Sequence, residues 1–372
     1  MSGSSIPGET DALDTPAVPV AEVGRSRLPG PLGGTLGRAI AVSEAGILLS
    51  LVALVLAFWL INDAFTSSAN IRAMAIGMSY VGIIAVGQTL LLVGGEFDLS
   101  VGSVAGLCAV ASGWLMTDGS LPVAVALALG LGLGALLGLV NGLVVVRLGI
   151  PAFIATLGMF YSARGLDFII TNGYPVYPLP DVVGEIGAAE VVFGVGWSLV
   201  ILVVLGIVAD LVLRRTTIGR NLYATGGNKE IARLVGINTD LYKIACFAIT
   251  GMLAALAGLL VMASLASGST TIGQGWELIV IAGVVVGGVS LFGGVGTVAA
   301  GLIGMVVLQV VQSGLVVSGV SPNWQTVAVG FVMVLAVGLD LLRRKVSAGG
   351  GPRRRRGSSR SARQSEGAAS GP

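Results

Sequence analysis

Long apolar runs occupy most of this chain, and they limit its fold more than any other feature. A transmembrane helix needs about 20 apolar residues to cross about 30 Å of hydrocarbon. Ten runs approach or exceed that length, at 39–61, 72–93, 99–116, 122–146, 153–170, 193–213, 244–267, 276–291, 297–317 and 324–342. Lipid offers the backbone no hydrogen-bond partners, and the runs lack the alternation of barrel strands, so they must be helices. The sequence therefore predicts an all-α polytopic membrane protein of about ten transmembrane helices, with 99–116 and 276–291 short enough to be broken or partly re-entrant.

The composition agrees with this class. Charged residues make up 11% of the 372 residues, whereas a soluble domain carries about 25%. The 58 glycines are spread through the apolar runs, where small residues let helices approach closely in lipid. Residues 1–38 and 343–372 have no apolar period, and we expect both to be disordered cytoplasmic tails. The second tail is rich in Arg and is typical of segments that bind anionic lipid headgroups.

The basic residues indicate how the runs are oriented. With the N-terminus in the cytoplasm and ten crossings, all but two of the 21 Lys and Arg residues fall on the cytoplasmic side, the exceptions being Arg72 and Arg164. Cytoplasmic loops of membrane proteins carry an excess of Lys and Arg. The sequence therefore predicts a transmembrane domain over 39–342 with both termini in the cytoplasm.

The sequence lacks the residues that metal binding and phosphate binding usually need. The chain has no His, and its two cysteines, Cys108 and Cys246, lie singly inside apolar runs, so we predict no metal site and no cofactor. No G-x-x-x-x-G-K-[ST] motif is present, so the chain has no phosphate-binding loop of its own. The net charge of +2 gives no field that would attract nucleic acid. We expect a chain that is not an enzyme.

The longest polar segment between two runs, residues 214–243, is predicted to lie in the cytoplasm. Within it, Asn228 can cap a short helix from Lys229 to Val235, and Gly236 can end that helix. A short two-sided helix on the cytoplasmic face is shaped to contact another protein.

Two acidic motifs adjoin the short runs. The first, VGGEFDLSVGS at 93–103, holds Glu96 and Asp98, and the second, at 276–296, begins with Glu277 and ends in glycines. Acids near membrane depth cost several kcal/mol and are usually functional. Acids at these positions can also cap the helices that follow them. The sequence leaves both interpretations open.

Two further patterns concern the interior. Arg164 and Asp167 are spaced i,i+3 on one predicted helix, which favours a neutralising pair over a substrate role. The segment 141–158 resembles 313–330, and the predicted topology turns one copy inside and the other outside. Such a relation is typical of inverted five-helix repeats.

Five motifs together resemble a known family. They are GGEFDLSVGS, NGLVVVRLGIPAFIATLG, SARGLDFIITNGYPV, GRNLYATGGNKEIARLVGI and ELIVIAGVVVGGVSLFGGVGT. In this order and spacing they look like the permeases of ribose-, galactose- and xylose-type ATP-binding-cassette sugar importers. The resemblance covers roughly residues 45–342.

The resemblance implies a machine of several chains in the bacterial cytoplasmic (inner) membrane. A second permease copy pairs with this one, and a cytoplasmic ATP-binding-cassette ATPase, supplied as a separate chain, docks on both. An extracytoplasmic sugar-binding protein delivers a monosaccharide, which crosses by alternating access. The missing phosphate-binding loop fits this scheme, because ATP is hydrolysed on the partner.

The family's docking loop has an E-A-A-x-x-x-G pattern, which Glu230, Ala232 and Gly236 match, whereas Ile231 stands at the middle Ala. With Arg233, the three matching residues are our candidates for coupling to the ATPase.

Our candidates for the translocation path are Glu96, Asp98, Asn141, Thr156 and Glu277. In the first motif many relatives carry Gly-Ile where this chain has Glu96-Phe97, and an extra acid there would bear on substrate preference.

Two alternatives stay open. The same machine could carry a nucleoside or another small polar solute. A carrier coupled to protons or sodium would instead use Asp98 and Glu277 as relay acids. The docking loop argues against the second alternative, and the lack of a sizeable soluble domain argues against a purely structural or receptor protein.

Overall fold

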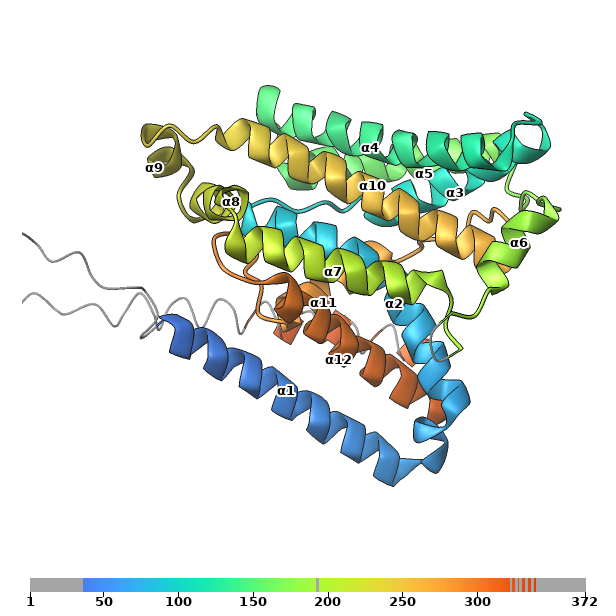
Figure 1. Ribbon diagram of the computed structural model, residues 1–372, viewed down its shortest axis with the longest axis horizontal. Helices are drawn as coiled ribbons and strands as arrows, with labels where there is room; N and C mark the ends of the chain where they lie inside the picture. The colour runs from blue at the N-terminus through green and yellow to red at the C-terminus, as the bar shows by residue number, and fades with distance from the viewer. Residues whose placement is uncertain are drawn as a thin grey trace, which may run out of the picture. The chain divides into compact units, whose positions relative to one another are not determined.

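The computed structural model describes residues 36–191 and 194–321, together with scattered positions between 323 and 338. Contacts divide the chain into a first unit, Met1–Val42, and a second, Ser43–Pro372, which holds the helical bundle considered below. The elements are α1 Leu36–Ile61, the short 3-10 helix η1 Asp63–Thr66, α2 Ser68–Val93, α3 Val101–Thr117, α4 Val123–Arg147, α5 Ala152–Thr171, α6 Asp181–Ala188, α7 Trp197–Arg215, α8 Thr217–Gly227, α9 Lys229–Leu234, α10 Thr239–Leu265, α11 Trp276–Val286 and α12 Val298–Val317 (Figure 1). Every regular element among the described residues is a helix, which confirms the all-α prediction.

The helices reproduce most of the predicted runs. Among the described residues, α2, α4, α5, α7, α10 and α12 are long and apolar enough to cross a membrane. Two predicted runs give shorter helices, α3 and α11, as the short runs suggested. The eleven residues of α11 rise only about 16 Å, or half of the hydrocarbon thickness.

Several predictions fall on residues outside the described part of the chain. Most of the predicted tenth span, 324–342, lies there, and so do five residues near the end of the second repeat copy, 313–330. The predicted tails lie there too, apart from residues 36–38, which belong to α1.

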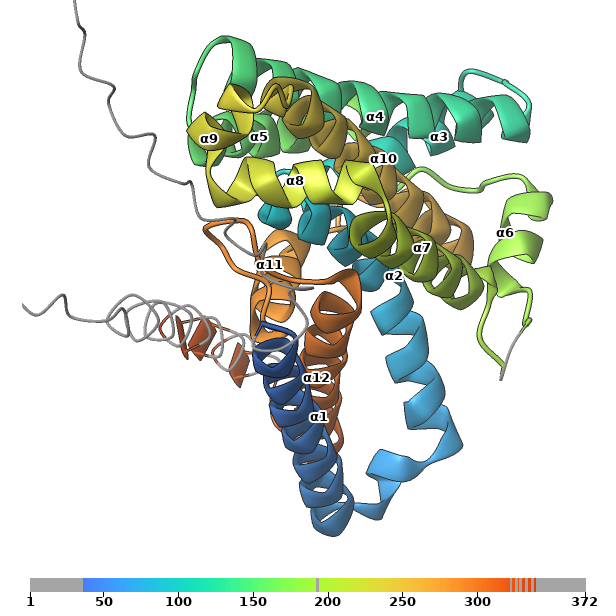
Figure 2. The same ribbon diagram turned by 60° about the vertical axis from the view of Figure 1, so that its left-hand side comes forward.

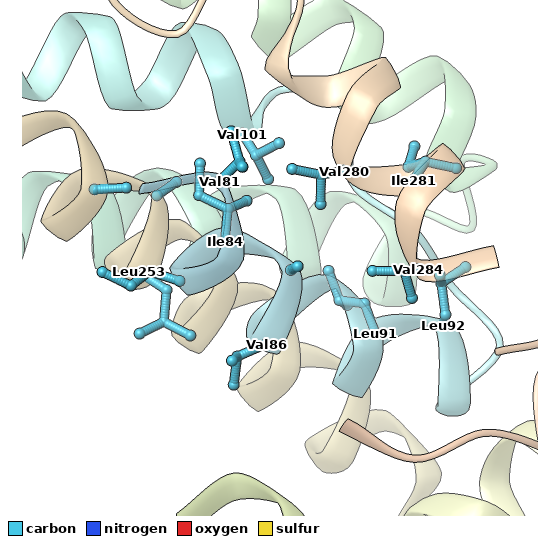
Figure 3. Close-up of a cluster of buried hydrophobic side chains, with 14 of the residues drawn as sticks. Val81, Ile84, Val86, Leu91, Leu92, Val101, Leu253, Val280, Ile281 and Val284 are labelled. Carbon is cyan, nitrogen blue, oxygen red and sulfur yellow. The ribbon is translucent and has the colours of Figure 1, made fainter. Parts of the chain in front are cut away.

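The centre of the bundle is α2. It packs against α7, α10, α11 and α12, and Ile83, Ile84 and Leu92 on it are fully buried. Figure 3 shows its side chains between Val101 of α3, Leu253 of α10 and the α11 residues Val280, Ile281 and Val284. An interior this apolar on all sides of one helix explains why α2 shows no amphipathic pattern in the sequence.

Glycines let α4 and α10 pack with their backbones in contact. The glycines of α4 that face α10 recur every fourth residue, at Gly130, Gly134, Gly138 and Gly142. A Cβ on Gly138 would lie 2.2 Å from the carbonyl oxygen of Phe247, and one on Gly251 of α10 would lie 2.2 Å from the carbonyl oxygen of Gly134. Such close approach at small residues is the usual way in which helices associate in lipid. It confirms the role that we expected for the many glycines.

Polar elements lie at two ends of the bundle. The short helices α8 and α9 lie at one end, here called the coupling end, and α6 lies at the other (Figures 1 and 2). The predicted runs 153–170 and 193–213 left the residues between them without a helix, but α6 forms there and packs on α10, where a Cβ on Gly187 would lie 2.1 Å from the carbonyl oxygen of Ala263. An antiparallel bridge between Val176 and Gly268 joins the same region.

Residues 266–275, between α10 and α11, are not helical, and four of them, Gly268, Thr270, Ile272 and Gly273, are buried. They pack against α3 so closely that a Cβ on Gly102 would lie 2.2 Å from the carbonyl oxygen of Gly273. Arg164 of α5 donates to the carbonyl oxygen of Thr270 at 2.7 Å. Buried non-helical backbone needs protein groups as hydrogen-bond partners, and the Arg164 guanidinium is the partner of this carbonyl oxygen. The short run 276–291 thus gives the short helix α11, preceded by a non-helical segment.

Candidate functional site

The helix predicted in the cytoplasmic loop is α9. As expected, Asn228 caps it, because its side-chain oxygen accepts a hydrogen bond from the N–H of Ile231 at 3.0 Å. The helix ends at Leu234, and Gly236 follows with a φ of 85°, a left-handed conformation that suits glycine. The N–H of Gly236 donates to the carbonyl oxygen of Arg233, which closes the last turn.

The outer face of α9 is apolar and exposed. Ile231 is 59% exposed, Leu234 86% and Val235 69%. Ala232 is buried beneath them, and Glu230 is exposed at their edge. Sequence reasoning chose Glu230 and Ala232 from the family pattern and missed the three apolar side chains. Their signal was present, since large apolar residues on a polar loop mark an interaction surface.

Arg233 fastens α9 to the beginning of α10. Its guanidinium donates to the Oγ1 of Thr239 at 2.9 Å and to the carboxylate of Asp240 at 2.5 Å. Lys229, at the other end of α9, lies 3.6 Å from the same carboxylate. Two basic residues of α9 thus share one acid of α10, so α9 and the first turn of α10 are held as a unit.

Three pairs of glycines from distant parts of the sequence meet at the coupling end. They are Gly94-Gly95 after α2, Gly226-Gly227 at the end of α8 and Gly293-Gly294 between α11 and α12, here called the diglycine junction. The N–H of Gly294 donates to the carbonyl oxygen of Val93 at 2.9 Å. A Cβ on Gly226 would lie 1.9 Å from that oxygen, and one on Gly293 would lie 2.6 Å from the carbonyl oxygen of Gly226. Backbone therefore packs on backbone, and a side chain at these two positions would separate the three segments.

A tyrosine adds a second contact between α8 and the loop after α11. Tyr223 donates to the carbonyl oxygen of Gly296 at 2.5 Å. Burial, with a smaller contribution from the negative charge of Asp210, raises the pKa of the Tyr223 phenol. The phenol therefore stays a neutral donor. We did not predict α8 as a separate helix, although Thr216 caps it by accepting a hydrogen bond from the N–H of Gly219.

The structure brings together two of the predicted path residues, Asp98 and Asn141. Asp98 is 1% exposed, and its Oδ1 accepts from the N–H of Ser100 at 2.7 Å and from the Ser100 hydroxyl at 2.6 Å. The side-chain amide of Asn141, on α4, donates to Asp98 Oδ2 at 3.2 Å and to the Ser100 hydroxyl at 3.0 Å. These three residues, here called the Asp98 cluster, fasten the start of α3 to α4.

Glu96 has a different partner from Asp98. Its carboxylate forms an ion pair with the ammonium group of Lys243, in the second turn of α10. A cavity of about 480 Å³ opens beside this pair and reaches Lys229 and Glu230 at the start of α9. The cavity is also bounded by Gly94, Gly95, Thr225, Gly226, Gly227, Asn228 and Phe292.

The other two predicted path residues lie apart from the Asp98 cluster. Glu277, in the first turn of α11, lies across α3, where a Cβ on Gly102 would be 2.5 Å from its Oε2. Thr156 of α5 is fully buried, and its hydroxyl donates to the carbonyl oxygen of Ala152 within the same helix. No hydrogen bond in the described structure joins Thr156 or Glu277 to the Asp98 cluster.

Buried polar atoms without a partner are few. Among the described residues they are the two amide atoms of Gln88, Oδ1 of Asp167 and Oε2 of Glu277. Gln88 is wholly buried on α2, and sequence reasoning missed it because a lone amide inside an apolar run forms no motif. Leaving such a group unpaired costs about 1–3 kcal/mol, so each of these side chains is a candidate for contact with a polar solute.

Arg164 and Asp167 form the ion pair that their spacing predicted, at 3.3 Å. Arg164 has a second partner, because the same nitrogen also donates a hydrogen bond to the carbonyl oxygen of Thr270. That second contact joins residues far apart in the sequence and could not be predicted from local spacing.

The described structure is an apolar helical bundle that has buried polar groups in its interior and an exposed apolar face on a short helix at one end. These features fit a membrane transport protein. Residues 70–337 match the family described as "Branched-chain amino acid transport system / permease component", and the chain belongs to this family.

Relatives of known name agree with this assignment. The chain is 38% identical to the ribose import permease protein RbsC of Escherichia coli (strain K12), over 80% of this chain and 93% of that one. It is 37% identical to the autoinducer 2 import system permease protein LsrC of Photorhabdus luminescens, over 69% and 77% of the two chains. It is 31% identical to the xylose transport system permease protein XylH of Haemophilus influenzae, over 80% and 96%. The family and these relatives are transport components, as the sequence predicted for this chain.

Proposed function

We propose that this chain is the membrane permease of an ATP-driven importer that carries a monosaccharide across the bacterial cytoplasmic membrane. The names of relatives supply the solute class, since two of the three above transport ribose or xylose. The observation that carries the proposal is the exposed apolar face of α9, formed by Ile231, Leu234 and Val235. A water-exposed face of this kind calls for a protein partner. The proposed partner is a cytoplasmic ATP-binding-cassette ATPase, with Glu230 at the rim of the contact.

In this proposal the other coupling candidates position the docking surface. Ala232 is small enough to let α9 lie flat, Arg233 ties it to Asp240, and Gly236 turns the chain away from it. The ATPase would then move α9 and the first turn of α10 as one body. The diglycine junction offers a route from α8 to the loops after α2 and α11.

The proposed permease works as a pair of copies. Each copy crosses the membrane ten times, its spans form two inverted five-helix repeats, and both of its termini lie in the cytoplasm. The solute path runs through this pair. Its polar groups are Asp98, Asn141, Thr156 and Glu277, with Glu96 at the cytoplasmic end; Gln88 joins them because its amide has no partner. Discontinuous helices commonly build solute sites near the middle of transporters, and the segment before α11 is such a discontinuity. An extracytoplasmic binding protein would deliver the sugar at the end that carries α6.

The first test is recovery of partners from the native membrane. A tagged chain extracted in mild detergent should bring down an ATPase and a sugar-binding protein. Leu234→Asp and Glu230→Arg should lose the ATPase, because the first puts a charge into the apolar contact and the second reverses the charge at its rim. Ile186→Asp is the matched control, since Ile186 is an exposed apolar residue, 46% accessible, on the short helix α6 at the other end. Equal ATPase recovery from all three variants would refute docking through α9.

The second test separates this proposal from an ion-coupled carrier. Vesicles that hold the complex are given ATP after the proton and sodium gradients have been collapsed. Uptake of D-ribose or D-xylose should continue and should need ATP. Uptake that stops with the gradients and ignores ATP would instead support Asp98 and Glu277 as relay acids.

A further inference from the structure

The ion pair between Lys243 and Glu96 is almost closed off from solvent. The Lys243 side chain is 9% exposed and that of Glu96 is 17% exposed. Lys243 is the one buried basic residue in the described part of the chain. A buried lysine without its acid would be strongly unfavourable. The two groups should therefore stay together while the surrounding segments move.

This pair joins two groups of side-chain contacts. On one side, Arg233 ties α9 to Asp240, and Asp240 lies one helical turn before Lys243 on the same face of α10. On the other side, Glu96 is two residues from Asp98, which holds Ser100 and α4. Side-chain contacts and short stretches of backbone therefore connect the docking surface with the start of α3.

The turn before Glu96 is closed onto the end of α2. Gly95 has a φ of 81°, and its N–H donates to the carbonyl oxygen of Leu92 at 2.9 Å. The N–H of Glu96 donates to the carbonyl oxygen of Leu91 at 3.0 Å. A pull on Glu96 would therefore act on the end of α2 as well as on the segment that leads to α3.

We propose that the Lys243–Glu96 ion pair is a positioning link that carries movement of the ATPase-bound α9 to the Asp98 cluster, and so sets how much solute is moved for each ATP hydrolysed. The proposal rests on the proposed function. It gives Lys243 a role in coupling, and it gives Glu96, proposed above at the cytoplasmic end of the path, a coupling role that requires no contact with the solute. Neither residue belongs to the exposed face of α9, so the ATPase still binds when the link is broken.

The test measures solute moved per ATP hydrolysed by the complex of permease, ATPase and binding protein in liposomes, with D-ribose and D-xylose as probes. Glu96→Gln and Lys243→Gln should each lower this ratio by about threefold or more, while ATPase activity and ATPase binding persist. The charge reversal, Glu96→Lys combined with Lys243→Glu, should recover at least half of the loss. Lys243→Arg keeps the charge and should remain close to the wild-type ratio.

A second ion pair supplies the control. Arg72 and Glu190 are paired at the end of the bundle opposite α9, with side chains 44% and 55% exposed. Glu190→Gln removes the same kind of charge but lies outside the proposed link, so it should leave the ratio unchanged.

The outcomes separate the possible roles. If Glu96→Gln lowers transport and ATP hydrolysis in equal proportion, together with the melting temperature, the pair is structural and the proposal is wrong. An unchanged ratio in both single variants also overturns it. Should Lys243→Gln fail to fold, Glu96→Gln and the charge reversal still decide the matter. Failure of the proposed function is distinct, because the wild-type complex would then show no uptake that depends on ATP.

Discussion

The contact between α4 and α10 yields the most quantitative prediction. In Gly138→Ala the new Cβ would lie 2.2 Å from the carbonyl oxygen of Phe247 and 3.0 Å from the Cα of Ala248. These are backbone atoms that cannot rotate away, and ordinary contacts begin at 3.4 Å. The helices must therefore separate locally by about 1 Å, a gap that already forfeits a quarter to a half of each dispersion contact there. Overpacking of this kind costs about 1–3 kcal/mol.

A glycine on the same helix isolates that cost. Gly132 has no atom within 4 Å of the position of a Cβ, so Gly132→Ala meets no neighbour. Both substitutions replace a helical glycine with alanine and gain the same helix propensity, about 0.5–1 kcal/mol. The difference between the two variants is therefore the packing cost alone. For a bundle of this size it corresponds to a melting temperature about 2–5 °C lower for Gly138→Ala.

The assay is thermal melting of the purified chain in one detergent, with the monodisperse fraction measured after heating. Gly138→Ala should melt below the wild-type protein, and Gly132→Ala at or slightly above it. Equal melting temperatures for the two alanine variants would refute the reasoning, since they would mean that α4 and α10 do not meet through their backbones at Gly138.

Three further predictions follow from the coupling end and the non-helical segment before α11. Gly226→Ala should lower the rate of solute uptake by vesicles at least about tenfold, because the new Cβ would lie 1.9 Å from the carbonyl oxygen of Val93. Gly227→Ala should take up solute at the wild-type rate, because no atom lies within 4 Å of its Cβ position. Arg164→Met should destabilise the protein by about 3 kcal/mol in thermal melting, since it leaves the carboxylate of Asp167 and a carbonyl oxygen of the non-helical segment unpaired; stability equal to wild type would contradict this account. Asp98→Asn should lower the stability of the protein by about 1–3 kcal/mol in thermal melting, because the new amide can accept from Ser100 but turns an N–H toward the side-chain amide of Asn141, itself a donor. An unchanged melting temperature would show that the Asp98 cluster does not hold α3 to α4.

Local chemistry in the sequence was enough to predict the helices and the ends of some of them. The apolar runs predicted the long apolar helices, because the thickness of the hydrocarbon layer sets the length of a helix that spans it. Asn228 and Gly236 gave the two ends of α9 because capping depends only on neighbouring residues. The start of α10 was predicted at 244, five residues late, because Asn238 caps a polar turn that precedes the apolar run.

Contacts between distant segments were not predictable in this way. The pairing of Lys243 with Glu96 joins residues 147 apart, and neither residue has a motif that names the other. The second partner of Arg164, the carbonyl oxygen of Thr270, was hidden for the same reason. Of the segment 266–275, only residues 266 and 267 were predicted as helix, and the rest was left between two apolar runs because it is rich in Gly, Ser and Thr. Its close packing against α3 involves residues far away in the sequence and could not be predicted from the segment itself.

The diglycine junction suggests why the motifs GGEFDLS, ATGGNKE and FGGVG occur in one chain. Each pair of glycines ends or follows a helix, and the three pairs converge on one another at the end that carries α9. A junction made of side chains could shift rotamers and absorb a displacement of α8, whereas backbone in contact with backbone has no such freedom and transmits it. The same glycines leave each loop free to turn at its own helix end. Rigid contact between loops, combined with a hinge in each loop, is what a permease needs if one docking surface is to move the starts of α3 and α12 together.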